Sequence, residues 1–135
     1  MALDPVFPKT PQFAVATVTA ANTNNDGTGE ITTLLTAGDE GSLITNLHCN
    51  RGGTSTATQV RLFISLDNGT TWKLLDVRLL AAYTLSPTTL PVDQIFVDRI
   101  NPNSSIRLPA HAKIGVTIAV AQSAGVNFLA EYMDY

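Results

Sequence analysis

The sequence predicts an all-β protein, a single β-sandwich of about eight antiparallel strands with a jelly-roll-like arrangement and an extended N-terminal arm. Two observations predict strands. Apolar and polar residues alternate with a period of two, and runs rich in Val, Ile, Thr and aromatic residues are separated by clusters of Gly, Asn, Asp and Pro. A third observation excludes much helix, because no window of comparable length has the apolar period of about 3.6 that an amphipathic helix needs.

Composition indicates one ordinary globular domain. The chain has 135 residues, of which 44% are hydrophobic and 14% charged, with a net charge of −3. A chain of this size buries enough surface to fold without disulfides or metal. The single cysteine, Cys49, cannot form an internal disulfide. We expect an arm over residues 1–11 and a β-sandwich domain over residues 12–135.

The arm is predicted from proline. Two apolar residues, Val6 and Phe7, lie between Pro5 and Pro8, and Pro11 follows three residues later. Proline fixes φ and restricts the residue before it to extended conformations. The segment is therefore either a frayed terminus or a strap that lays Phe7 on a neighbouring subunit.

The eight strands follow from alternation between turn clusters. They are expected near residues 12–20, 30–36, 42–49, 58–66, 71–80, 94–97, 105–108 leading to 113–121, and 126–132. The clearest alternation places Ile114, Val116, Ile118 and Val120 on one face of their strand. A second case opposes Val60, Leu62, Ile64 and Leu66 to Arg61, Phe63 and Ser65. Each of these strands is expected to have one dry face, while Thr and Ser dominate the outward positions.

Residues 65–72, Ser-Leu-Asp-Asn-Gly-Thr-Thr-Trp, predict a hairpin turn. Asp67 can accept hydrogen bonds from turn amides, Gly69 can adopt positive φ, and Trp72 can fold back over the hairpin. The spacing resembles the Asp-box of sialidases, which is a structural turn repeated once per propeller blade. It occurs here once in a short chain, so a small glycan hydrolase is the weaker interpretation.

Residues 22–30 superficially resemble a calcium loop with Asn in the first two acidic positions. Calcium would take oxygens from Asn22, Asn24, Asp26 and Glu30. Thr33 stands where an EF-hand places its bidentate Glu, and strands flank the segment. We therefore expect a plain loop between two strands and no metal.

No arrangement typical of an enzyme is recognisable. His48 and Cys49 are neighbours and point to opposite faces of a strand, so they cannot pair; we expect Cys49 buried and His48 partly exposed. His111 has no ligand spacing around it. Four carboxylates could pair as in a glycosidase only if the fold brought two together: Asp93, Asp98, Glu131 and Asp134. We expect no enzyme and no cofactor.

Charge and hydropathy exclude two further classes of partner. The eight Lys and Arg residues are scattered and outnumbered by eleven acids, so no basic stripe exists for nucleic acid. Apolar stretches fall far short of the ~20 residues that a spanning helix needs, so we expect no membrane insertion. No secretory signal is visible, which predicts synthesis in a cytoplasm and export only inside an assembly.

Four segments, in the same order along most of the chain, resemble small structural proteins encoded among the virion genes of tailed bacteriophages. They are Ala-Leu-Asp-Pro-x-Phe-x-x-Thr-Pro at 2–11, Ala-Asn-Thr-Asn-Asn-Asp-Gly-Thr-Gly at 21–29, Val-Arg-Leu-Phe-Ile at 60–64, and Asn-Phe-Leu-Ala-Glu at 127–131. The resemblance implies a capsid decoration or cement protein that binds the outside of the phage head. The implied partners are the major capsid protein and sister copies, in a homo-oligomer for which a trimer is the guess from the class.

The expected contacts with capsid or sister subunits lie in the arm and at the C-terminus, at Pro5, Val6, Phe7, Pro8, Tyr132 and Tyr135. Tyr is favoured at contact sites where its ring is buried and its hydroxyl is solvated. The same two rings could instead cap the core of the sandwich. An alternative function is a tail or fibre-tip domain that binds a host surface glycan. Trp72, Tyr83 or Tyr132 would then be stacking platforms.

Overall fold

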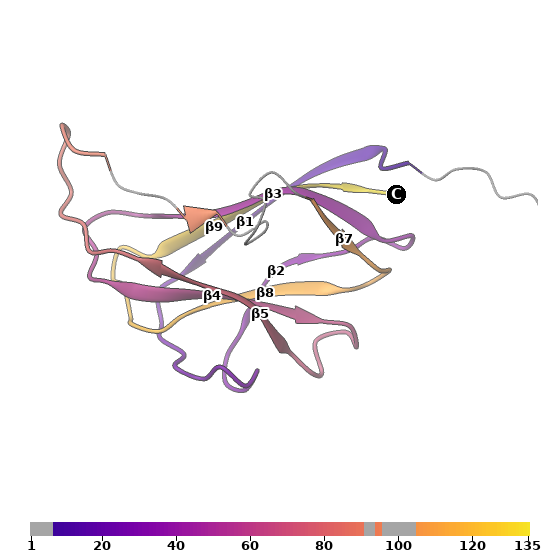
Figure 1. Cartoon of the computed structure of the whole chain (residues 1–135), viewed down its shortest axis with the longest axis horizontal. Coiled ribbons are helices and arrows are strands. Elements are labelled where there is room, and N and C mark those ends of the chain that lie inside the picture. The colour runs from indigo at the N-terminus through magenta and orange to yellow at the C-terminus, as the bar shows by residue number, and fades with distance from the viewer. Residues whose placement is uncertain (1–6, 91–93, 96–104) are drawn as a thin grey trace, which may run out of the picture.

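Two antiparallel sheets pack face to face in a computed structural model that describes residues 7–90, 94–95 and 105–135 (Figure 1). Every regular element in these ranges is a β-strand. The prediction of an all-β sandwich is therefore confirmed.

The first sheet is built around the last strand of the chain. Its order is β1-β9-β3-β6, and β7 also pairs with β3. The strands are β1 (Thr10–Val18), β3 (Ser42–Arg51), β6 (Gln94–Ile95), β7 (Ile106–Leu108) and β9 (Val126–Asp134). Because β1 lies beside β9, the first and last strands of the domain are paired over their whole length.

The second sheet has the order β2-β8-β4-β5. Its strands are β2 (Thr32–Thr36), β4 (Thr58–Ser65), β5 (Lys73–Leu80) and β8 (Lys113–Ile118). Register shifts interrupt β2 between Thr33 and Leu35, and the β4–β5 pair between Leu62 and Phe63. The shift in β2 turns both Leu34 and Leu35 into buried positions.

The core fills the space between the sheets. Its fully buried large side chains include Ile44, Leu47, Val60, Leu62, Leu80, Ile114, Val116, Ile118, Val126 and Phe128. They come from both sheets at alternate positions, as a strand with one face inward requires.

One strand was expected at residues 105–108 leading to 113–121, but the structure has two strands there. Ile106–Leu108 belongs to the first sheet and Lys113–Ile118 to the second. Between them the chain turns at residues 109–112, where Ala112 N donates to Pro109 O at 3.2 Å and His111 adopts a φ of 62°. The turn carries the chain across the sandwich from one sheet to the other.

The expectation of one dry face on the strands now named β4 and β8 is also wrong. Their inward residues are buried as predicted, but Phe63 and Thr117 on the opposite face are buried too. Val120 lies beyond the end of β8 and is 45% exposed. The outward face is buried because loops from elsewhere in the chain cover it.

Those loops hang below the second sheet in Figure 1, where the segment between β1 and β2 lies under β4, β5 and β8. Arg61 on β4 is only 4% exposed, and its Nη1 donates to Asn22 O at 2.7 Å. A Cβ built on Gly115 of β8 would lie 2.8 Å from the Trp72 ring and would also collide with Ile31. The loop and the Trp72 ring together form a roof over the second sheet.

β1 begins at Thr10, two residues before the strand expected from residue 12. Thr10 and Pro11 are the first residues of β1, in register with Asp134 and Met133 of β9. Residues 1–6 of the expected arm lie outside the described residues.

Candidate functional site

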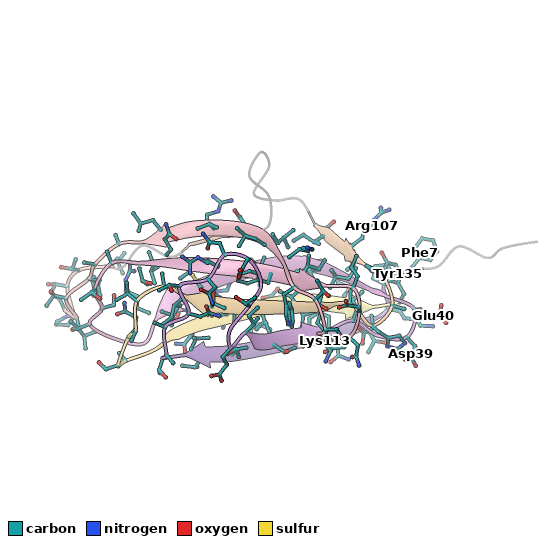
Figure 2. All side chains as sticks on the ribbon, turned by 90° about the horizontal axis from the view of Figure 1, so that it is seen from below. Phe7, Asp39, Glu40, Arg107, Lys113 and Tyr135 are labelled. Carbon is teal, nitrogen blue, oxygen red and sulfur yellow. The ribbon has the colours of Figure 1, made fainter. Side chains whose placement is uncertain are left out.

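One end of the sandwich gathers several of the residues expected to make contacts. Figure 2 shows Phe7 and Tyr135 at this end, together with Asp39, Glu40, Arg107 and Lys113. The two termini meet there because Lys9 N donates to Asp134 O at 3.0 Å. Phe7 is 69% exposed, whereas Pro8 and Tyr135 are half-buried. Pro5 and Val6 lie outside the described residues.

Asp134 is the polar centre of this end. Its carboxylate accepts from Ser42 Oγ at 2.5 Å and from Gln12 Nε2 at 3.4 Å. Ser42 Oγ in turn accepts from Gly38 N at 3.1 Å, which holds the β2–β3 turn against β9. The carboxylate is thus engaged in joining the terminal strand to its neighbours.

Tyr132 is partly buried and packs against the core. Burial raises the pKa of its hydroxyl, and the nearby Asp134 carboxylate adds to the increase. This position matches the interpretation in which the ring caps the sandwich. Tyr135 instead lies at the terminal edge, where its N–H donates to Gly41 O at 3.2 Å.

An exposed apolar stripe runs along the outer face of β1, and we did not predict it. Phe13 is 58% exposed and Val15 is 59% exposed, while the alternate residues Ala14 and Ala16 pack against the core. Phe7, which precedes the strand, is also exposed. The sequence contained one signal of this arrangement. Ala alternates with Phe and Val in this strand, and a face made of small residues can be the one that packs against the core.

Cross-strand neighbours continue this surface. On the outer face of the first sheet Val15 lies opposite Leu129, and Pro11 lies opposite Met133. Glu131 is exposed between these rows, opposite Phe13. The outer face of β1 and β9 therefore has little charge, a composition typical of the centre of a protein–protein interface.

The two sheets therefore differ in how their outer faces are covered. Much of the second sheet is covered by the β1–β2 loop and by Trp72, although Leu79 of its edge strand β5 is 62% exposed. Phe13 and Val15 on the first sheet are also largely exposed. Large apolar side chains grouped on an exposed surface mark interaction sites more often than isolated ones do. The outer face of β1 is the candidate contact surface.

The hairpin at residues 65–72 forms as predicted. Asp67 Oδ1 accepts from Thr71 N at 2.8 Å and from Ser65 Oγ at 2.9 Å, and Gly69 adopts a φ of 86°. Asn68 also adopts positive φ, at 62°. The hydrogen bond from Thr71 N is the main reason why the pKa of Asp67 falls below its ordinary value. These residues serve the turn.

The loop at residues 22–30 is closed by its own hydrogen bonds. Asn22 Nδ2 donates to Thr28 O at 3.0 Å and Glu30 O at 2.9 Å, while Asn22 Oδ1 accepts from Asn24 N at 3.0 Å. Asp26 Oδ1 accepts from both the hydroxyl and the N–H of Thr28, which lowers the pKa of Asp26. Two of the oxygens that calcium would take, Asn22 Oδ1 and Asp26 Oδ1, are thus used as turn acceptors.

The remaining catalytic or metal candidates do not come together. Cys49 is buried and His48 is partly exposed, as predicted. Glu131 and Asp134 lie three residues apart on β9 and face opposite sides of the sheet. Asp93 and Asp98 lie outside the described residues. Within the described ranges no three His, Cys, Asp or Glu residues are grouped so that they could hold a metal ion.

The three aromatic residues considered for glycan stacking are engaged in the fold. The Trp72 ring covers Gly115, and Tyr132 packs against the core. The Tyr83 hydroxyl donates to Thr89 O at 2.6 Å, and the Arg51 guanidinium lies 5.6 Å from the centre of its ring. Their ring faces are occupied in part by the protein itself.

No protein-family model matches the chain, and no curated protein matches it. In the part of the chain that the structure describes, no helix has the length and apolar character to cross a bilayer.

Proposed function

We propose that this protein is a bacteriophage virion structural protein that binds the outside of the head and stabilises the capsid shell. The observation that carries the proposal is the group of exposed apolar side chains at Phe7, Phe13 and Val15, on a sandwich whose interior is well packed. A decoration protein needs a rigid domain and a contact surface, and it needs no catalytic group. The resemblance of the four sequence segments to phage virion proteins supplies the identity of the partner, the major capsid protein.

The proposed architecture is a jelly-roll-like sandwich with a Pro-rich arm over residues 1–11. The strand orders β1-β9-β3-β6 and β2-β8-β4-β5 support it, because strands early in the sequence alternate between the two sheets. Such alternation is typical of two interlocked Greek keys. The arm leaves the domain beside Tyr135, where Phe7 is exposed and can contact a neighbour.

The proposed mechanism is multivalent attachment. The arm, with Val6 and Phe7 as anchors between Pro5 and Pro8, and the outer face of the first sheet contact capsid subunits or sister copies. Each contact is small, but many identical copies on one shell act together through high effective concentration. The protein is made in the bacterial host cytoplasm and joins the capsid surface there.

The test is the location and copy number of the chain in purified virions. Heads and tails are separated on a density gradient, and quantitative mass spectrometry gives the ratio of this chain to the major capsid protein. Many copies on heads are expected. A few copies found only on tails would overturn the proposal and direct the search to host glycans.

The contact residue is tested by Phe7→Ala. We expect fewer copies per head, because truncating an anchoring aromatic at an interface typically costs about 1–2 kcal/mol or more. The matched control is Leu85→Ala, since Leu85 is 68% exposed on a loop away from the arm. Equal occupancy of wild type and Phe7→Ala on heads would remove Phe7 from the contact.

A further inference from the structure

β1 is a long strand edge with few of the features that keep edges from pairing, although Pro11 removes one backbone N–H from it. Within the described residues it pairs only with β9, through nine residue pairs and no register shift. Apart from this ladder, no backbone hydrogen bond of Thr10–Val18 is formed within the described part of the chain. The strand contains no charged residue. An uncharged, regular and open edge is a template for another strand.

The other edges of the sandwich differ from β1 in this respect. β5 carries Lys73, Asp76 and Arg78, and its pairing with β4 includes a register shift. β2 has five residues and a bulge. Beyond β3, the described residues of the first sheet form two short strands, β6 and β7, of two and three residues. Charge, bulges and short length are the usual protections of a sheet edge.

The side chains of β1 are complementary to those of a second β1 running antiparallel. Ala14 is the midpoint of the strand, so full overlap of two copies places each Ala14 opposite its equivalent. Phe13 of one copy then faces Val15 of the other, and Pro11 faces Thr17. Aromatic and β-branched residues are favourable cross-strand pairs, and no like charges meet. The exposed apolar residues of both copies become partly covered.

We propose that β1 pairs antiparallel with β1 of a second copy of this chain, across a two-fold axis at Ala14. The first sheets of the two copies then form one continuous sheet, with a contact that uses the same patch on both partners. This contact is two-fold and differs from the trimer expected from the resemblance. It does not depend on attachment to a capsid.

The first experiment measures self-association of the purified full chain by sedimentation velocity over a wide concentration range. The wild type is expected to shift from monomer to dimer as concentration rises. Val15→Lys is expected to stay monomeric under the same conditions, because a lysine on an edge strand opposes pairing. Val15 is exposed, so the substitution leaves the interior unchanged; Phe13→Lys is the second variant should Val15→Lys not fold by circular dichroism.

The matched control is Leu79→Lys. Leu79 is 62% exposed on β5, at an edge of the other sheet. We expect this variant to dimerise like the wild type. A wild type that stays monomeric throughout would overturn the proposal, and so would Val15→Lys and Phe13→Lys both dimerising as strongly as the wild type.

A second experiment tests the register. Directly opposite residues in an antiparallel pair have Cα atoms about 4.5–5.5 Å apart, within reach of a disulfide. Ala14→Cys is expected to cross-link two copies under mild oxidation, whereas Thr17→Cys, which faces Pro11 of the other copy, is not. Cys49 is buried in both variants. Cross-linking of Thr17→Cys without cross-linking of Ala14→Cys would contradict the proposed register.

The outcomes separate this inference from the proposed function. A chain that dimerises through β1 but is absent from heads supports the pairing and overturns capsid attachment. A chain that decorates heads while it remains monomeric in solution, with no Ala14→Cys cross-link on the head, overturns the pairing alone.

Discussion

Gly115 is placed on β8 where the Trp72 ring crosses the strand, so its missing side chain determines the packing of the roof. A Cβ there would lie 2.8 Å from one atom of the Trp72 ring and 3.0 Å from another. Gly115 does not have positive φ, so an alanine there would cause no backbone strain. Its only cost would be the collision of the added Cβ with neighbouring side chains. Small residues of this kind set how closely loops approach a sheet.

Gly115→Ala is therefore expected to reduce the free energy of unfolding by about 1–3 kcal/mol, the usual cost of overpacking. Urea unfolding followed by circular dichroism measures it. Trp72→Phe, which shortens the ring, is expected to cost less in the Gly115→Ala background than in the wild type, because it relieves the part of the clash that involves Trp72. Strictly additive effects of the two substitutions would contradict this account.

Asp67 makes stability depend on pH at acid values. Its pKa lies below 3.8 because the carboxylate accepts hydrogen bonds from Thr71 and Ser65. A pKa that is lower in the folded state stabilises the fold above the unfolded pKa, and this contribution is lost as pH falls through the folded pKa. We expect the wild type to be more stable than Asp67→Asn at neutral pH, with the difference shrinking below about pH 4.

The measurement is urea unfolding of both proteins from neutral to acid pH. Asp39→Asn is a suitable control, because Asp39 is an exposed carboxylate in the β2–β3 turn and is not part of the hairpin. A gap between wild type and Asp67→Asn that stays constant down to acid pH would show that the charge of Asp67 does not stabilise the turn.

At the scale of elements, the roof depends on Arg61 of β4. Arg61 Nη1 donates to Asn22 O, and Nη2 donates to Gln59 Oε1 at 2.8 Å. The guanidinium is nearly buried and connects the loop to the sheet beneath it. A loop held in this way should open locally when the connection is removed, without unfolding of the sandwich.

We expect Arg61→Ala to destabilise the protein by about 1.5–3 kcal/mol, as for other hydrogen bonds to a charged group. Hydrogen exchange is expected to accelerate at the amides of Asn24 and Thr28, which bond to side chains within the loop. Amides of β9 serve as the reference for the sandwich. Unchanged exchange at Asn24 and Thr28 would show that the loop closes without Arg61.

Individual strands were predicted better than their connections. β3, β4 and β9 begin where the alternation begins, because period-two patterning is a local property of a strand. The segments 105–108 and 113–121 were expected but counted as one strand, because alternation does not show that the chain crosses to the other sheet at residues 109–112. His111 adopts the positive φ there, a conformation that is uncommon outside glycine but in which histidine is enriched.

At the scale of the whole molecule, the termini share one end of the sandwich. The pairing of β1 with β9 brings Thr10 beside Asp134. Phe7 and Tyr135, the first and last described residues, lie at the same end of the sandwich. Contacts by Phe7 and by the outer face of the first sheet can then act on one partner surface.

Heads that lack this protein are expected to release DNA at a lower temperature than decorated heads, because the bound copies reinforce the shell. DNA release on heating, followed with a DNA-binding dye, measures the difference. Adding purified wild type back should restore the temperature, and Phe7→Ala should restore it less. Identical release curves with and without the protein would contradict a stabilising role.

The all-β class, the hairpin at residues 65–72 and the burial of Cys49 could be predicted from the sequence, because they follow from alternation and turn chemistry among near neighbours. Which sheet has its outer face covered could be seen only in the folded structure. Arg61, Trp72 and the loop after β1 are distant in the chain, and they meet because β4 and β8 lie side by side in the second sheet. The exposure of Phe13 and Val15 was decided in the same way, since a strand's pattern separates its two faces without saying what packs on each.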